Sequence, residues 1–220
     1  MLRLENVTKT YRTRNGTFNA LDDVSLHIEA GEFAVIRGAS GCGKTTLLMT
    51  FAGMLRPTRG TVLFGDRDLY RMGSAERACF RAQNLGFVFQ MFHLVPYLSI
   101  AENVLLPAAA AGLADPGTRA AELIDKLGLA SRRHHDPTQL SAGEKQRTAV
   151  ARAMLNEPRV ILADEPTGNL DPDNARAVLG HLAEYHKGGG TVVIVTHGPE
   201  AAQFADKIIH LNAGRIDSNP

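Results

Sequence analysis

One segment, "RGASGCGKTTLL" at residues 37–48, restricts the possible folds of this chain more than any other. Its pattern, G-x-x-x-x-G-K-[S/T], is typical of a turn between a buried strand and a helix. Glycines let the backbone N–H groups of the turn converge on one point, and the positive end of the helix dipole faces the same point. The pattern therefore predicts a phosphate-binding loop formed by Gly38, Ala39, Ser40, Gly41, Cys42, Gly43, Lys44, Thr45 and Thr46.

Within this loop, two side chains are suited to a nucleotide and its metal ion. The Lys44 ammonium group is expected to reach the β- and γ-phosphates, and the Thr45 hydroxyl group to bind Mg²⁺. Cys42 lies mid-loop, where the backbone does the binding, so we interpret its side chain as a spacer. The motif alone leaves kinases, GTPases, helicases and transporters open, because all of them share it.

The composition excludes several classes of partner and environment. Among 220 residues, 24 Lys and Arg balance 23 Asp and Glu, which argues against a nucleic-acid partner. Two cysteines form no disulfide framework, which favours a reduced, cytosolic setting. The start "MLRLENVTKTY" has no signal-peptide core, and the longest apolar stretch, "VLLPAAAAGLA", is too short for a bilayer. Any membrane role would therefore need a partner protein.

Apolar runs along the chain predict an α/β fold. Four runs are apolar at every position, as in a parallel sheet covered on both faces. These runs are residues 33–36, 87–89, 160–163 and 192–195. Three N-terminal segments alternate instead and predict an antiparallel part: "MLRLENV", "VSLHIEA" and "TVLF".

The region between the second and third runs contains no strand candidate. We expect residues 91–156 to form a helical subdomain inserted into an α/β core. The prediction is thus a single domain over residues 1–220, with residues 1–90 and 157–220 as the core. Polar residues at capping positions mark helix starts. The predicted caps are Ser99 with Glu102, Asp115 with Pro116, Ser141 with Glu144, and Asp171 with Pro172.

Two carboxylates follow the predicted strand at residues 160–163. Asp164 would stand at the carboxyl edge of a parallel sheet, where open α/β folds bind ligands, and it can hold Mg²⁺ through water. Glu165 is then free to orient or deprotonate a water that attacks the γ-phosphate. An Asp-Glu pair is often only a polar loop, but with the phosphate loop upstream we interpret Glu165 as catalytic.

Residues 140–147, "LSAGEKQR", indicate which kind of phosphate-binding protein this is. Alone, the segment predicts only a capped helix start. With "ARAM" after it and Asp164 further on, it resembles the signature of ATP-binding-cassette (ABC) ATPases, usually written LSGGQ. In that family the signature contacts the ATP of a second chain. The resemblance assigns this role to Ser141, Ala142, Gly143 and Glu144.

Further segments match the family's motifs in the family's order. "KTYRTRNGTFNALDDVSL" resembles the opening segment and implies that Tyr11 stacks on adenine. "FVFQ" resembles the Q-loop, whose glutamine, here Gln90, reaches Mg²⁺ and the attacking water. "GNLD" resembles the D-loop at the dimer contact, with Asp171, and "VTHG" supplies His197 to contact the γ-phosphate.

The family roles complete the expected site. The resemblance implies ATP and Mg²⁺ as ligands and a P-loop NTPase core as the fold. The implied catalytic residues are Lys44, Gln90, Glu165 and His197. The implied metal-binding residues are Thr45, Gln90 and Asp164.

The resemblance narrows to cassettes of lipoprotein-releasing and macrolide-export systems, with the cell-division-type cassette as a near neighbour. It rests on "RNGTFNALDDVSL", "GFVFQMFHLVPYLSIAENV" and "EPTGNLD". It implies a head-to-tail homodimer with ATP at composite sites, which drives a separate integral membrane permease from the cytoplasmic face of the cell membrane. Apolar residues after Gln90 are expected either in the subdomain core or in a groove for a helix of the permease. They are Phe92, Leu94, Tyr97 and Leu98.

The signature departs from the family pattern at two positions. Ala142 replaces a glycine, and its methyl group needs only ordinary helical space. Glu144 replaces glutamine, so its charge must point away from phosphate, and a capping box with Ser141 gives it that direction. We therefore expect an active ATPase.

A cytosolic ABC ATPase of the chromosome or DNA-repair type is the alternative. Such proteins carry a long coiled coil between Q-loop and signature, whereas the segment between Gln90 and Ser141 is short and lacks heptads. A kinase would leave "LSAGE" and "VTHG" unexplained, and a ribosome-acting cassette protein would normally need two cassettes in one chain. The sequence names neither the transported substrate nor its direction of movement.

Overall fold

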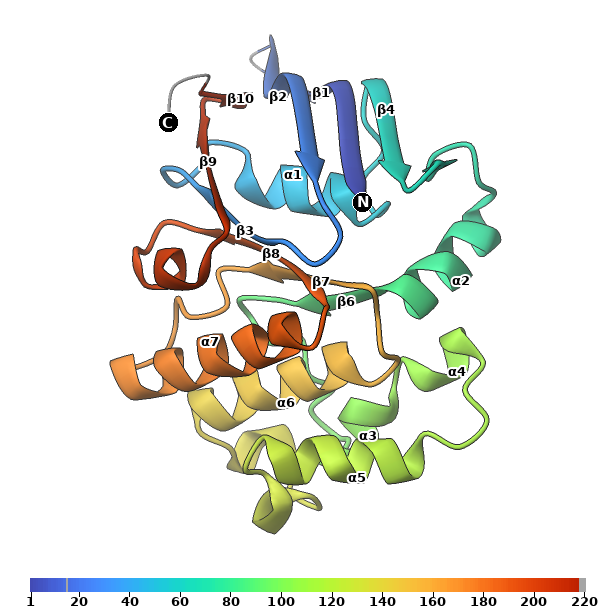
Figure 1. Cartoon of the computed structure of the whole chain (residues 1–220), viewed down its shortest axis with the longest axis vertical. Helices are drawn as coiled ribbons and strands as arrows, with labels where there is room; N and C mark the ends of the chain where they lie inside the picture. The colour runs from blue at the N-terminus through green and yellow to red at the C-terminus, as the bar shows by residue number, and fades with distance from the viewer. Residues whose placement is uncertain (15, 218–220) are drawn as a thin grey trace.

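The structure, a computed structural model, describes residues 1–14 and 16–217, and its elements form stacked layers (Figure 1). The central layer is a six-stranded sheet in the order β10-β9-β3-β8-β7-β6. Its strands pair in parallel except β10, which is antiparallel to β9. The strands are β3 (Phe33–Arg37), β6 (Leu85–Val88), β7 (Val160–Asp164), β8 (Thr191–Thr196), β9 (Lys207–Asn212) and β10 (Arg215–Ile216).

The central strands are apolar throughout because helices cover both faces of the sheet. On β3, Ile36 packs into one core with helix α1 (Lys44–Phe51). Its neighbour Val35 packs into a second core with α6 (Ala142–Met154) and α7 (Pro172–Lys187). Successive strand residues point to opposite faces, so each strand contributes to both cores. The predicted parallel sheet is confirmed, although β6 begins and ends earlier than expected.

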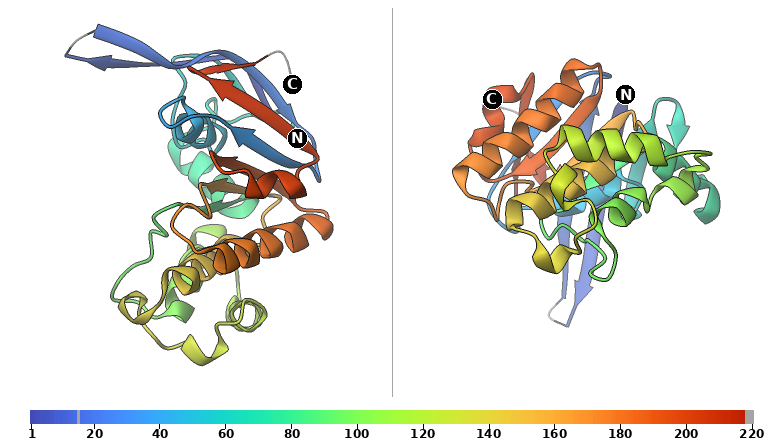
Figure 2. Two further views of the ribbon diagram at one scale, coloured as in Figure 1. Left: turned by 90° about the vertical axis from the view of Figure 1, so that its left-hand side faces the viewer. Right: turned by 90° about the horizontal axis from the view of Figure 1, so that it is seen from below.

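A second sheet of four strands, in the order β2-β1-β4-β5, covers α1 from the side opposite to the central sheet (Figure 1). All its pairings are antiparallel, as the alternating N-terminal segments predict. The far end of the β1–β2 hairpin extends beyond the body of the molecule (Figure 2). The strands are β1 (Leu2–Thr13), β2 (Gly16–Ile28), β4 (Arg59–Phe64) and β5 (Arg67–Asp68).

Helices dominate the middle of the chain, and the described residues of the range 91–156 contain no strand, as predicted. The remaining helices are α2 (Ser74–Asn84), α3 (Ile100–Leu105), α4 (Ala108–Ala111) and α5 (Gly117–Lys126), with 3-10 turns at Ala130–Arg132, Pro137–Gln139 and Glu200–Phe204. Side chains of Ser99, Ser141 and Asp171 cap α3, α6 and α7. The prediction at Asp115 is wrong, because Pro116 itself has helical dihedral angles and is the uncapped N-cap of α5.

The helical range has no core separate from the sheet. Ile100, Ile124 and Val150 belong to the same apolar cluster as Ile161 and Ile194 of the central sheet. The helices are thus anchored on one sheet face, and the boundaries of the helical subdomain stay a prediction. In the described part of the chain, no helix combines the length and the apolar character needed to cross a bilayer.

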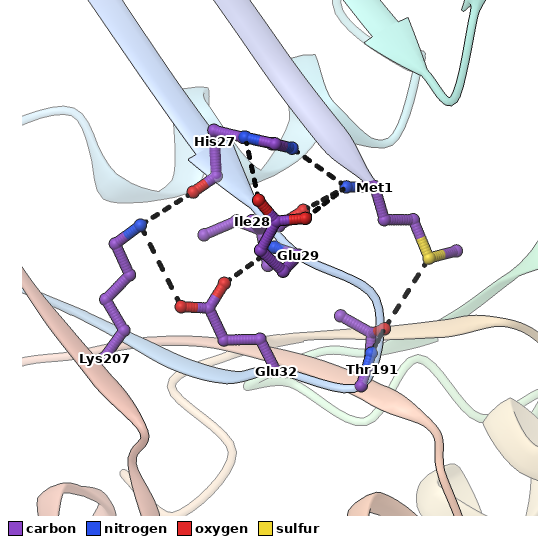
Figure 3. Close-up of polar contacts among 8 residues, drawn as sticks. Met1, His27, Ile28, Glu29, Glu32, Thr191 and Lys207 are labelled. Atoms are coloured by element: carbon purple, nitrogen blue, oxygen red, sulfur yellow. Dashed lines mark hydrogen bonds and ion pairs between the residues drawn. The ribbon is translucent and has the colours of Figure 1, made fainter.

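Polar contacts join the two sheets at one edge (Figure 3). Lys207 on β9 donates to the carbonyl oxygen of His27 on β2 at 2.9 Å, and its Nζ lies 3.9 Å from a Glu32 carboxylate oxygen. The Thr191 hydroxyl group, at the start of β8, donates to the Met1 sulfur atom at 3.6 Å. These contacts fix the four-stranded sheet relative to the central one.

One buried amide holds the chain between β6 and α3. Asn103, on α3, is fully buried, and its Oδ1 accepts from the Val95 N–H at 2.7 Å. Its Nδ2 donates toward the carbonyl oxygens of Val95, Leu98 and Ser99 at 3.1, 2.9 and 3.0 Å. A single side chain thus satisfies main-chain groups across the whole turn before α3.

We expect Asn103→Ala to lower the free energy of unfolding by about 2–3 kcal/mol, because buried main-chain groups lose their partner. Asn84→Ala is the matched control: it removes one hydrogen bond, to the Phe80 carbonyl oxygen at 2.9 Å, and should cost about 1 kcal/mol. Urea denaturation of both variants measures the difference. Equal losses would contradict the assigned role of Asn103.

Candidate active site

The phosphate loop turns from β3 into α1 through backbone that only glycine fits. Gly43 is the N-cap of α1 with φ 108°, and a Cβ atom there would overlap the Ala20 carbonyl oxygen. At Gly38, a Cβ atom would overlap the Leu211 carbonyl oxygen and the Cys42 sulfur. Both glycines are thus required because other main-chain segments approach them closely.

The Lys44 ammonium group is held inside this loop. Its side chain is only 7% exposed, and Nζ donates to the carbonyl oxygens of Gly38 and Ala39 at 2.9 and 3.0 Å. Nζ also lies 3.6 Å from Oε1 of Glu165, whose side chain is 11% exposed. The contact joins the first turn of α1 to the end of β7, as expected for two groups that act on one phosphate.

Asp164, the last residue of β7, faces the start of α1. The Thr45 hydroxyl group donates to its Oδ1 at 3.2 Å. Burial raises the pKa of the Asp164 carboxyl above its ordinary value, and the hydrogen bond from Thr45 acts in the opposite direction. Hydroxyl and carboxylate oxygens are the ligands that Mg²⁺ prefers, so this pair fits the expected metal site.

Glu165 combines strained backbone with two fixed carboxylate oxygens. Its φ is 44°, in the left-handed region, and its N–H donates to the Val195 carbonyl oxygen at 2.9 Å. Oε1 faces Lys44, whereas Oε2 accepts from the His197 N–H at 3.2 Å and lies 3.0 Å from His197 Nδ1. Such strain persists where the surroundings force it, and it is frequent at functional sites. The structure thus brings Lys44, Glu165 and His197 together.

A cavity of about 520 Å³ opens beside these groups. Tyr11 lines it and stacks on Phe18 with ring centroids 5.6 Å apart, and the loop residues Gly41 and Gly43 also line it. Gln90 also lines the cavity, at the end of the segment after β6. The predicted site residues on its wall are Tyr11, Ser40, Gly41, Gly43, Lys44, Thr45, Thr46, Gln90 and Glu165.

Other predicted residues lie outside this cavity. Asp164 contacts it only through Thr45, and His197 lines a neighbouring cavity of about 450 Å³ that Glu165 also borders. Cys42 is 8% exposed, and its side chain belongs to the apolar core. Its role as a spacer rather than a nucleophile agrees with that burial.

The signature residues form the expected capping box and do not line the cavity of this chain. The Ser141 hydroxyl group accepts from the Glu144 N–H at 3.2 Å, and Glu144 Oε2 accepts from the Ser141 N–H at 2.8 Å. The second Glu144 oxygen pairs with Arg132 at 3.2 Å. The hydrogen bond from the Ser141 backbone, with lesser help from Arg132, lowers the pKa of the Glu144 carboxyl. The charge of Glu144 is thus directed onto its own helix start.

Sequence reasoning missed how the signature meets the D-loop segment. Gly143 is buried, and a Cβ atom there would overlap the Asn174 side chain on α7. Asn174 accepts from Arg147 at 2.8 Å and donates to Asp171 at 2.6 Å. Gln146, fully buried, donates to the Pro166 carbonyl oxygen at 2.7 Å. The only sequence signal for these contacts was polar residues on the inner face of α6.

Apolar side chains gather in a groove beside Gln90. We call it the Phe89 groove, a cavity of about 390 Å³ bordered by Met54, Phe87, Phe89, His93, Leu106 and Arg152. Met54 and Leu106 are 47% and 43% exposed. None of the four residues expected in the subdomain core or in a groove lines this groove or belongs to an apolar core cluster. They are Phe92, Leu94, Tyr97 and Leu98, and Tyr97 is 83% exposed.

Comparisons with known proteins agree with this geometry. Residues 21–168 match the family model described as ABC transporter. The chain is 41% identical over its full length to an Aeromonas hydrophila protein named "Macrolide export ATP-binding/permease protein MacB 2". It is 44% identical over 98% of its length to the MacB protein of Burkholderia pseudomallei. The chain spans about a third of the length of these curated relatives.

A solved structure resembles the whole chain. It is the dimeric ATP-binding cassette MJ0796 in a post-hydrolysis state with ADP and Pi, which superposes with a TM-score of 0.92. The two sequences are 38% identical, and the match covers 99% of this chain and 97% of that one. The predicted P-loop NTPase fold is therefore confirmed, and the chain belongs to the ABC transporter family.

Proposed function

We propose that this chain is the ATP-hydrolysing, nucleotide-binding subunit of an ABC transporter. The observation that carries the proposal is the contact of Lys44 with Glu165, and of Glu165 with His197, beside a cavity lined by Tyr11. A cation for phosphate, a carboxylate for water and an aromatic ring for adenine stand around one space. Membership of the family and the ADP-bound state of the solved relative support the same reaction.

Each group at the cavity has a distinct part in hydrolysis. The loop N–H groups and Lys44 bind the β- and γ-phosphates, and Tyr11 stacks on the adenine. Glu165 orients and deprotonates the attacking water, and its contact with His197 holds the carboxylate in place. Gln90 borders the same space and positions the water.

The metal site needs the phosphates for completion. In the described residues, no cluster of three His, Cys, Asp or Glu side chains could hold a metal ion alone. Mg²⁺ would be held by Thr45, Gln90 and Asp164 together with phosphate oxygens. When bound, it neutralises negative charge on the phosphates.

We further propose that two copies form a head-to-tail homodimer in which each signature completes the partner's site. Ser141, Ala142, Gly143 and Glu144 do not line the cavity of their own chain. The helix that they start packs on the sheet face opposite to α1. Backbone N–H groups at such a helix start can stabilise charge on a γ-phosphate. Asp171, tied to Gly143 through Asn174, would lie at the same dimer contact.

An integral membrane permease of the macrolide-export or lipoprotein-release type is the proposed partner. The names of the relatives mention both an ATP-binding part and a permease part. The Phe89 groove, with exposed Met54 and Leu106, offers an apolar seat for a permease helix next to Gln90. With this partner, we propose that the chain lies on the cytoplasmic face of the membrane and has no nucleic-acid partner.

We expect Glu165→Gln to bind ATP but to lose Mg²⁺-dependent hydrolysis, because the amide cannot accept the proton of the attacking water. The loss should be at least about 10²-fold. Lys44→Ala should instead weaken ATP binding itself. Turnover and nucleotide affinity, measured separately for both variants, check the assignment. Near-normal turnover in Glu165→Gln would overturn it.

Two signature variants separate capping from catalysis. Ser141→Ala removes the cap and should cost about 1 kcal/mol of stability, yet hydrolysis should fall by about tenfold or more because a partner-site contact is lost. Glu144→Gln keeps the hydrogen bond to the Ser141 N–H, so activity should stay within a few-fold. Wild-type specific activity should rise with protein concentration. Small, equal activity losses in both variants would contradict the composite site.

Asp164→Asn tests the metal site without relying on activity. Because burial holds the pKa of Asp164 above its unfolded value, ionisation of this group opposes folding at neutral pH. The variant, without nucleotide, should therefore unfold at the same temperature as wild type or above it. MgATP should stabilise wild type more than the variant, as measured by thermal unfolding. Equal stabilisation by MgATP would remove Asp164 from the metal site.

A further inference from the structure

The main chain just after Gln90 has an unusual conformation. Phe92 and His93 are consecutive non-glycine residues in the left-handed region, with φ of 58° and 48°. The His93 N–H donates to the Met91 carbonyl oxygen at 2.5 Å, which closes a very tight turn. Left-handed backbone is unfavourable for residues with a Cβ atom, and two in succession require support from outside the turn.

Arg152, in the last turn of α6, supplies that support. Its two terminal nitrogens donate to the carbonyl oxygens of Phe92 and His93, both at 2.6 Å. Among the described residues, no carboxylate shifts the pKa of Arg152, because burial is the only cause of its shift. Burial lowers the pKa of its guanidinium group. The partly buried guanidinium group thus donates its side-chain hydrogen bonds to two main-chain carbonyl oxygens.

Arg152 stands where three parts of the molecule meet. The helix that carries it, α6, is capped by Ser141, the first of the four predicted signature residues. The turn that it holds follows directly on Gln90, whose side chain lines the nucleotide cavity. Arg152 and His93 themselves border the Phe89 groove, where His93 packs edge-on against Phe89 with ring centroids 4.7 Å apart.

We propose that Arg152 is a positioning residue that clamps the turn at residues 91–93, so that Gln90 keeps its side chain at the nucleotide cavity. The proposal rests on the function proposed above for Gln90. The guanidinium group holds two adjacent carbonyl oxygens at once, which a lysine ammonium group at the shorter reach of its side chain does less well.

Hydrogen exchange on the nucleotide-free protein tests the clamp itself. Arg152→Ala should raise exchange at residues 91–95 by about tenfold or more, with Arg152→Lys intermediate. Arg77→Ala is the matched control, because Arg77 also donates to a main-chain oxygen, that of Met72 at 3.0 Å, but on α2. It should leave exchange at residues 91–95 unchanged. Unchanged exchange in Arg152→Ala would overturn the clamp.

A double-mutant cycle with Gln90→Ala tests whether the clamp acts through Gln90. Arg152→Ala should lower kcat by about tenfold or more, with ATP affinity within about twofold of wild type. In the Gln90→Ala background, the same change should alter kcat by less than about twofold, because the residue that it positions is gone. If Arg152→Ala lowers kcat by the same factor in the Gln90→Ala background as in wild type, Arg152 does not act through Gln90. Its role would then be structural only, and the coupling would be overturned. Absence of ATPase activity in wild type would refute the proposed function, and the exchange data would still decide the clamp.

Discussion

The site depends on the contacts of one buried charge, the ammonium group of Lys44. A buried charge is stable only when hydrogen bonds and an opposite charge surround it. Here the loop carbonyl oxygens of Gly38 and Ala39 and the carboxylate of Glu165 do so. Because Glu165 also contacts His197 after β8, one cation ties β3, α1, β7 and β8 together. The phosphate loop has its shape because these four elements meet at one sheet edge.

Two features at the same sheet edge are unfavourable for folding, and packing elsewhere in the molecule offsets them. Burial raises the pKa of Asp164, and Glu165 has left-handed backbone. Neither feature stabilises the folded chain. Glu165 lines the cavity, and Asp164 contacts Thr45, which also lines it. The two apolar cores on either side of the central sheet supply the stability that allows such strain. Catalytic geometry and packing are therefore divided between the edge and the interior.

Helix α6 connects the parts that must act together. It begins at the Ser141 capping box, contacts the segment after β7 through Gln146, reaches α7 through Arg147, and ends near the clamp at Arg152. Gln146 Oε1 is buried and has no hydrogen-bond partner among residues 1–14 and 16–217. A buried amide with only one end satisfied is costly in a purely structural helix. The unsatisfied oxygen agrees with a role in which the polar contacts of α6 hold neighbouring segments in place rather than stabilise the fold.

The sequence by itself determined what short-range chemistry dictates. Glycine spacing predicted the loop, continuous apolar runs predicted the parallel strands, and serine-glutamate spacing predicted the caps at Ser99 and Ser141, because each depends on residues within one turn or strand. Strand β9 alternates in burial, so no continuous apolar run predicts it. The cap predicted at Asp115 is wrong because Pro116 already has the helical conformation. Only the tertiary structure decided that Gly143 lies against the Asn174 side chain and that Arg152 holds the turn after Gln90. These contacts join residues far apart in the chain, and no local pattern records which distant oxygen atom a buried side chain will meet.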